Sequence, residues 1–172
     1  RDVRVRARRV RQIQQVRAVR AGEGAEPATE AVGHLAQAGQ PAASWSLGVG
    51  VDGITIDKNQ EWLYFAPLSG YDVYRVRMTD LLDTGLSDAQ LSAKVEFYAH
   101  KPYNGGLTID ANSNLYLTEI GRHTIGIIPP DTRLYRDYVS DANMIWPDGV
   151  TYNSDGFMYS GAAQLIQTDT FQ

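Results

Sequence analysis

The stretch that decides the fold is Asp52-Gly53-Ile54-Thr55-Ile56-Asp57, because the chain contains it three times in related form. The other copies are Gly105-Gly106-Leu107-Thr108-Ile109-Asp110 and Asp148-Gly149-Val150-Thr151-Tyr152-Asn153. Their shared glycines, Gly53, Gly106 and Gly149, are 53 and then 43 residues apart, and each copy precedes a polar turn and a short apolar strand. A period of about 40–50 residues with strand–turn–strand content is typical of β-propeller blades.

The length of the chain limits how many blades it holds. At about 45 residues per blade, the repeated part of this 172-residue chain holds about two and a half blades. Closed propellers usually have about 4–8 blades. We therefore predict an all-β fold, a β-propeller fragment, and we interpret the start at Arg1 without Met as that of a fragment.

Alternating apolar residues and turn signals predict the strands within each blade. In the first blade we expect strands over residues 54–57, 62–67 and 73–77. In the second we expect them over residues 107–110, 114–119, 124–128 and 134–139, and in the third over residues 150–153 and 157–160.

An insertion in the first blade predicts one helix. Ser87-Asp88-Ala89-Gln90 has the pattern of a capping box, in which Ser87 and Gln90 bond each other's backbone amides. Leu91, Val95 and Tyr98 follow at helical spacing, so we predict a helix over residues 88–96.

Charge and composition exclude several classes of function. The first 20 residues contain eight Arg and one acidic residue, and the rest of the chain has eight basic and 19 acidic residues, a net charge near −11. This negative charge on the chain after residue 20 argues against nucleic acid as a partner. The chain has no Cys, which excludes disulfides, zinc–thiolate sites and thiol catalysis. No apolar stretch approaches the roughly 18 residues of a membrane span.

The chain divides into two parts by composition. Residues 1–43 are rich in Arg, Ala, Gln and Gly and contain no Phe, Trp or Tyr. We interpret them as a basic leader that is disordered or non-native, since such a composition buries too little apolar surface to fold alone. The alternative is an arm that binds nucleic acid or a membrane surface. Residues 44–172 form the predicted partial propeller domain.

Three polar residues are the candidates for a binding site. Asp52, Asn104 and Asp148 precede the innermost strands of the predicted blades, so they should converge at one mouth of the central channel. Such oxygen-bearing side chains can bind a hard cation, or hold a small ligand by hydrogen bonds. The structural alternative is that Asp-Gly and Asn-Gly only form turns.

Several motifs resemble bacterial members of the Yellow / major royal jelly protein family. They are Leu86-Ser87-Asp88-Ala89-Gln90-Leu91, Asn104-Gly105-Gly106-Leu107-Thr108-Ile109-Asp110, Tyr64-Phe65-Ala66-Pro67-Leu68-Ser69-Gly70, and Trp146-Pro147-Asp148-Gly149 followed by Ala163-Gln164-Leu165. The resemblance covers about residues 48–165. It implies a six-bladed propeller, secreted or periplasmic, with an amine or aromatic metabolite in the channel. It also adds Gln164 to the candidate ligand-binding residues.

More distantly, the repeats are similar to gluconolactonase-like propellers, which hold a divalent cation at channel-entry loops. That resemblance implies Ca²⁺ as a cofactor, with Asn104 and Asp148 as ligands.

Three hypotheses follow, and whether the chain is an enzyme stays open among them. The first is a small-molecule-binding propeller of the Yellow type, and the second is a calcium-dependent, lactonase-like hydrolase. The third is an incomplete propeller without activity of its own. An open stack of blades also exposes unpaired strand edges, which predicts self-association.

Overall fold

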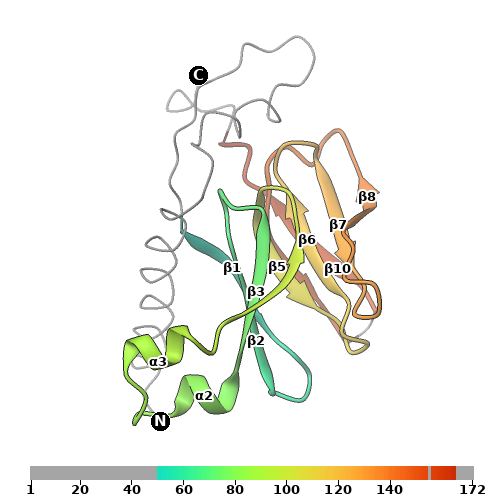
Figure 1. Ribbon diagram of the computed structural model, residues 1–172. Coiled ribbons are helices and arrows are strands. Elements are labelled where there is room, and N and C mark those ends of the chain that lie inside the picture. Colours follow the sequence, from blue (N-terminus) through green and yellow to red (C-terminus); the bar gives the residue numbers. More distant parts are fainter. Residues whose placement is uncertain (1–49, 155, 166–172) are drawn as a thin grey trace.

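The computed structural model describes residues 50–154 and 156–165, and these residues are mostly β (Figure 1). Blade 1 is a four-stranded antiparallel sheet of β1 (Val51–Ile56), β2 (Trp62–Pro67), β3 (Asp72–Arg77) and β4 (Glu96–His100). Blade 2 is a second such sheet, of β5 (Asn104–Ile109), β6 (Leu115–Glu119), β7 (Thr124–Ile128) and β8 (Arg136–Ser140). Blade 3 has two strands, β9 (Pro147–Tyr152) and β10 (Met158–Ala162).

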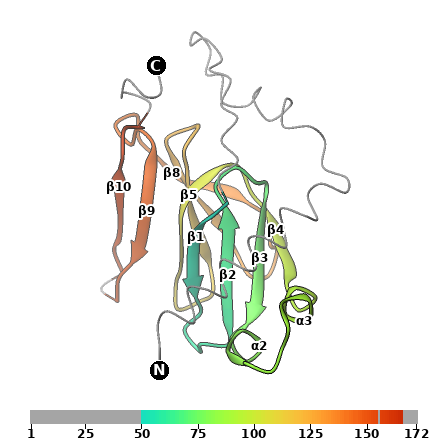
Figure 2. The ribbon, with the colours of Figure 1, turned by 90° about the vertical axis from the view of Figure 1, so that its left-hand side faces the viewer.

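The three sheets follow one another in the manner of propeller blades, and this confirms the predicted fold. Their first strands, β1, β5 and β9, are neighbours, and each later strand lies beside the one before it (Figures 1 and 2). The prediction for the basic leader, residues 1–43, lies outside the described residues, as do residues 44–49 and 166–172 of the predicted propeller domain.

Predicted strand bounds agree for some elements and differ for others. The bounds of β2 and β7 match the prediction, and β8 begins two residues later than predicted. The first strand of every blade begins three residues earlier than predicted, at Val51, Asn104 and Pro147. The X–Gly pairs that we expected in loops therefore lie inside strands.

The last residue of each repeat shapes the turn after the first strand. Asp110 Oδ1 accepts hydrogen bonds from the backbone N–H groups of Asn112, at 2.8 Å, and Asn114, at 2.9 Å. Asp57 does the same for Glu61 and Trp62, at 2.7 and 3.1 Å. Such bonds are the reason Asp and Asn favour turns.

Each of these turns also needs one residue in the left-handed region. The residues in this position are Gln60, Ser113 and Gly156, with φ of 57°, 65° and 87°. Two of the three are not glycine, so the hydrogen bonds of the turn must offset the cost of that backbone conformation.

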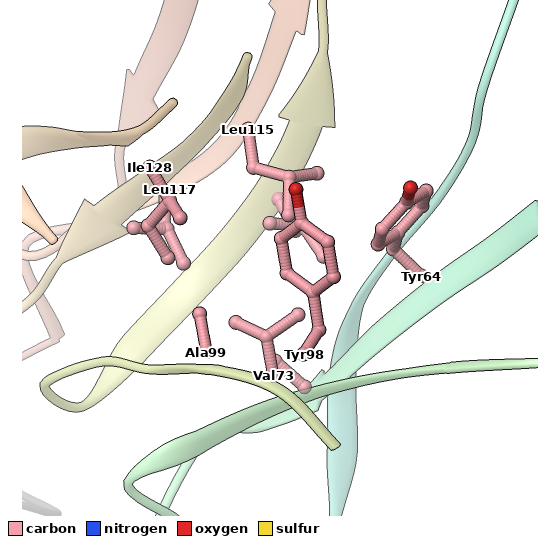
Figure 3. Packing of buried hydrophobic residues seen from close by; sticks show 9 residues of the cluster. Tyr64, Val73, Tyr98, Ala99, Leu115, Leu117 and Ile128 are labelled. Atoms are coloured by element: carbon pink, nitrogen blue, oxygen red, sulfur yellow. The ribbon is translucent and has the colours of Figure 1, made fainter. Parts of the chain in front are cut away.

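Two apolar clusters hold the blades together. Between blades 1 and 2, Tyr64, Tyr98 and Leu115 are among the buried residues shown in Figure 3, and the Tyr64 and Tyr98 rings meet edge to face with centroids 5.0 Å apart. Between blades 2 and 3, the cluster of Tyr116, Ile125 and Ile127 packs with Val150 and Met158. These clusters follow from the alternation of the strands, since every second side chain faces the neighbouring blade.

The insertion between β3 and β4 contains two short helices, α2 (Met78–Leu82) and α3 (Asp88–Ser92), rather than the single predicted helix. The capping box is present, with Gln90 N–H donating to Ser87 Oγ and Ser87 N–H donating to Gln90 Oε1.

The predicted extent of the helix, to residue 96, is wrong. The chain has to begin β4 at Glu96, opposite Arg75, and Tyr98 faces the core from that strand instead of from a helix. Tertiary pairing therefore overrides the helical spacing. Within the described residues, no helix has the length and apolar character that a membrane crossing requires.

Candidate functional site

The X–Gly pairs of the repeat form one β-bulge in each first strand. In β1, Val51 pairs with Pro67 and Gly53 with Ala66, so Asp52 is the extra residue. In β5, Gly105 and Gly106 together face Thr118, and in β9, Asp148 and Gly149 together face Gly161. Bulges of this kind re-aim side chains and often lie beside functional sites.

The glycines of the bulges let neighbouring strands approach closely. A Cβ atom at Gly53 would lie 2.8 Å from Leu107 Cβ, and one at Gly106 would lie 2.4 Å from the backbone oxygen of Asp148. Only glycine fits such contacts. The bulged ends of β1, β5 and β9 therefore come together at one end of the blades.

Asp52 and Asp148 hold equivalent bulge positions in β1 and β9, the two strands that flank β5 at this end. A Cβ atom at Gly105, the residue of β5 equivalent to both, would lie 3.0 Å from Asp148 Oδ1. The absence of a side chain at Gly105 leaves room for the Asp148 carboxylate between β5 and β9.

The electrostatics of this pair show that the two acids interact. Burial raises the pKa of the Asp52 carboxyl, and the negative charge of Asp148 raises it further. Among the described residues, neither Asp52 nor Asp148 takes part in an ion pair. Within residues 50–154 and 156–165, the negative charge of this pair is therefore not balanced by an ion pair.

Asn104 lies next to the pair but in a different environment. By register it is equivalent to Val51 and Pro147, one residue before the bulge, and its side chain is fully buried. Its Nδ2 donates to the backbone oxygen of Gly106 at 3.0 Å, while its buried Oδ1 has no hydrogen-bond partner among the described residues. Asn104 therefore lies near the two acids but occupies a different position in its strand, one residue before the bulge.

Gln164 lies at the same end of blade 3. Its backbone N–H donates to the oxygen of Ile145 at 3.1 Å, which places it just beyond the β9–β10 ladder, near the start of β9. Its side chain is exposed, and its φ of 54° is in the left-handed region. The role of all four predicted residues in binding a ligand stays a prediction.

Thr118 connects the bulges of blades 2 and 3, and sequence reasoning missed it. Its buried Oγ1 accepts from Gly106 N–H at 2.7 Å and donates to the Asp148 backbone oxygen at 2.8 Å. The equivalent positions in the other blades are Ala66 and Gly161, so the repeat contains no signal for this contact.

Two tyrosines near the same end were also missed. The rings of Tyr71 and Tyr103 stack with centroids 5.0 Å apart and planes 26° apart. Burial, and then a hydrogen bond with Tyr71, raise the pKa of Tyr103 above its ordinary value. Tyr71 precedes β3 and Tyr103 precedes Asn104, so both belong to the connections at the Asp52 end.

Lys101 fixes the position of these connections. Its buried ammonium group donates to the backbone oxygens of Pro67, Gly70 and Pro102, at 2.8, 2.5 and 3.1 Å. Because carbonyl oxygens already surround this charge, Lys101 acts as a structural tie between the β2–β3 turn and the β4–β5 connection.

Glu119 is another acid at this end, and its charge is compensated. It lies opposite Asn104 in the sheet, is buried, and binds the Arg122 guanidinium through two 2.7 Å hydrogen bonds. Tyr135 Oη also donates to it at 2.7 Å. The charge of Glu119 is therefore compensated, unlike the charges of Asp52 and Asp148.

Comparison with solved structures reveals distant similarity to propellers. Hydrazine synthase from Kuenenia stuttgartiensis matches with a TM-score of 0.51 and 17% identity, over 72% of this chain and 32% of that chain. Virginiamycin B lyase from Staphylococcus aureus matches with a TM-score of 0.48 and 16% identity, over 68% and 36%. A gluconolactonase from Xanthomonas campestris matches with a TM-score of 0.48 and 10% identity, over 72% and 46%.

These similarities concern the fold alone. The described blades correspond to part of a propeller, and the chain spans between about a third and a half of the structures it matches. No protein-family model and no curated protein matches the chain, so the resemblance to the Yellow family stays a prediction.

Proposed function

We propose that this chain contributes to a small-molecule-binding propeller of the Yellow type, with an organic amine as ligand at the end where Asp52 and Asp148 meet. The observation that carries the proposal is the position of the Asp148 carboxylate, whose Oδ1 lies 3.0 Å from where a Cβ atom of Gly105 would be, while Asp52 holds the equivalent position in β1. Burial, and then the negative charge of Asp148, raise the pKa of Asp52, so the two carboxylates repel each other. A bound cation would relieve that repulsion, because an opposite charge favours the ionised form of both acids.

The stacked tyrosines favour an amine with an aromatic part. Tyr71 is partly exposed, and its ring and that of Tyr103 lie in the connections at the same end as the acids. Aromatic faces attract cations and pack against planar groups, with about 0.5–1 kcal/mol for an exposed cation–π contact. The exposed side chain of Gln164 could add a hydrogen bond to the ligand.

A calcium-dependent hydrolase is the second candidate, and Asn104 is the observation in its favour. Its Oδ1, which has no hydrogen-bond partner in the part of the chain that the structure describes, and the Asp148 carboxylate are the kinds of oxygen that Ca²⁺ prefers. The fit is incomplete, because calcium takes about six to eight oxygen ligands. In addition, the described residues contain no group of three or more His, Cys, Asp or Glu side chains that could hold a metal. We therefore place the amine first.

Calorimetry with two matched probes tests the proposal. Tyramine has an aromatic ring and a charged amine, whereas 4-ethylphenol lacks the amine. We expect tyramine to bind the 172-residue chain more tightly than 4-ethylphenol does. The variants Asp52→Asn and Asp148→Asn should each weaken tyramine binding about fivefold, since each removes one exposed charge partner.

Asp131→Asn is the control, because Asp131 lies in the β7–β8 connection, at the other end of blade 2. Equal affinity for tyramine in the parent chain and in both site variants would refute the proposal, as would equal affinity for the two probes. Binding of Ca²⁺ that is lost in Asn104→Ala, without any binding of tyramine, would favour the second candidate instead.

A further inference from the structure

Three arginines gather on two aromatic rings at the end of blades 1 and 2 that lies opposite the candidate site. The guanidinium carbons of Arg75 and Arg77 lie 3.9 and 4.3 Å from the centroid of the Trp62 ring. Those of Arg133 and Arg75 lie 4.8 and 5.4 Å from the centroid of the Tyr98 ring. Contacts of this kind attract a planar guanidinium to the ring and hold it in place. We call Arg75, Arg77 and Arg133 the arginine cluster.

The register of blade 1 and a connection of blade 2 bring the arginine cluster together. Trp62 pairs with Arg77 between β2 and β3, and Arg75 lies two residues earlier, on the same face of β3. Arg133 lies in the connection between β7 and β8. Trp62 also packs against the apolar cluster between the two blades. The cluster is therefore built by two sheets that each have four described strands.

The described residues neutralise one of the three charges in the cluster. Arg75 forms an ion pair with Glu96 at 2.9 Å. Arg77 and Arg133 are exposed, and neither forms an ion pair with a residue that the structure describes. The cluster therefore presents two positive charges on a chain whose net charge is −4.

The backbone at Arg133 gives independent support for a role of its side chain. Its φ of 53° is in the left-handed region, which is costly for a residue with a Cβ atom. Its N–H donates to the backbone oxygen of Pro129 at 2.9 Å, a bond that closes the turn without any side chain. Glycine would form this turn at lower cost, so the turn itself does not explain the arginine. Strain of this kind is often found at functional sites.

We propose that the arginine cluster binds a doubly charged oxyanion, the phosphate group of a small organic phosphate. The aromatic rings contact the faces of the guanidinium groups, which leaves the N–H donors at their edges for a ligand. Guanidinium groups bind phosphate oxygens through paired, charge-assisted hydrogen bonds. The two charges of Arg77 and Arg133 match the two charges of a phosphate monoester.

Calorimetry at constant ionic strength tests the proposal with phenyl phosphate and with benzoate, which carries a single negative charge. We expect phenyl phosphate to bind the 172-residue chain more tightly than benzoate does. Arg77→Gln and Arg133→Gln should each weaken phenyl phosphate binding about tenfold, the loss expected when one hydrogen-bonded charge partner is removed.

Arg136→Gln is the matched control, because Arg136 is an exposed arginine of β8 outside the cluster. It changes the net charge by the same amount and should leave the affinity unchanged. Equal weakening by the control and the two cluster variants would overturn the proposal, as would unchanged affinity in both cluster variants or equal affinity for the two probes.

Arg133→Gly separates binding from a purely structural role. Because glycine adopts a φ of 53° without strain, this variant should be at least as stable in urea as the parent chain, yet bind phenyl phosphate about tenfold more weakly. A variant that loses stability and keeps its affinity would refute the proposal. Asp148→Asn, at the other end of the blades, should leave phenyl phosphate binding unchanged, and a loss of binding there would contradict a site at the arginine cluster.

Discussion

Substitution of the bulge glycines by alanine gives the sharpest test of how the blades are held together. A Cβ atom at Gly106 would lie 2.4 Å from the Asp148 backbone oxygen and 2.9 Å from the Val150 backbone nitrogen. Both atoms belong to the backbone of β9, so no side-chain rotation can relieve the contact. At Gly149, the equivalent residue of blade 3, a Cβ atom would have no neighbour within 4 Å.

The size of the effect follows from these distances. Ordinary contacts begin near 3.4 Å, so Gly106→Ala must move β9 away from β5 by about 1 Å, which forfeits up to about half of the dispersion energy of the contacts it opens. The Thr118 bond to the Asp148 oxygen would lengthen as well, at about 1 kcal/mol. With the usual cost of overpacking, about 1–3 kcal/mol, we expect a net loss of about 2–3 kcal/mol in unfolding free energy.

Gly149→Ala should have the opposite sign. The side chain meets open space, and alanine reduces the conformational freedom of the unfolded chain, so a gain of about 0.4–1 kcal/mol is expected. Gly105→Ala should fall between the two, because its closest neighbour, at 3.0 Å, is the Asp148 side chain.

Urea unfolding followed by circular dichroism measures all three variants under one set of conditions. A Gly106→Ala protein as stable as the parent chain would contradict the close approach of β5 and β9. So would a Gly149→Ala protein destabilised as much as Gly106→Ala. If Gly106→Ala does not fold, the order of the remaining two variants still decides the question.

Two further predictions concern the acids and the turns. Because folding raises the pKa of Asp52, the folded state binds more protons than the unfolded state, and the unfolding free energy should fall as pH rises through that pKa. The variant Asp148→Asn should lower the pKa of Asp52, measured by carboxyl NMR, and should reduce this fall. An unchanged titration of Asp52 in that variant would contradict an interaction between the two acids. Ser113→Gly should raise the unfolding free energy measured in urea by about 0.5–1 kcal/mol, because it removes the cost of a φ of 65° in a residue with a Cβ. Gly156→Ala should lower the unfolding free energy by a similar amount, because Gly156 has a φ of 87°. The reverse order of the two variants would refute the assignment of these turns.

The repeat made the blades predictable from the sequence but not their register. Periodicity located the strands and the turns that Asp57 and Asp110 shape, and the capping box located the start of α3. An X–Gly pair before an apolar run fits both an entry loop and a bulge within a strand, and only pairing with the next strand distinguishes them. The sequence analysis therefore treated Asn104 as the equivalent of Asp52 and Asp148, whereas the register gives that position to Gly105.

Contacts between distant parts of the chain could not be predicted from the sequence, for a different reason. Tyr71 and Tyr103 stack because Lys101 ties their connections together, and neither the spacing nor the neighbours of the two tyrosines signals that contact. The same is true of Thr118, which acts at one blade boundary and has no counterpart in the other copies of the repeat.

The register also explains why two of the three bulges, and not all three, carry an acid. Gly105 occupies the position that Asp52 and Asp148 hold in their own blades. An aspartate there would place a third negative charge beside two that already repel, and its side chain would collide with Asp148. Glycine removes both problems and leaves space between the blades. The pair that remains costs stability at neutral pH, and a bound cation would return that stability. We therefore expect the same substitution, Asp148→Asn, to stabilise the free protein and to weaken its binding of an amine.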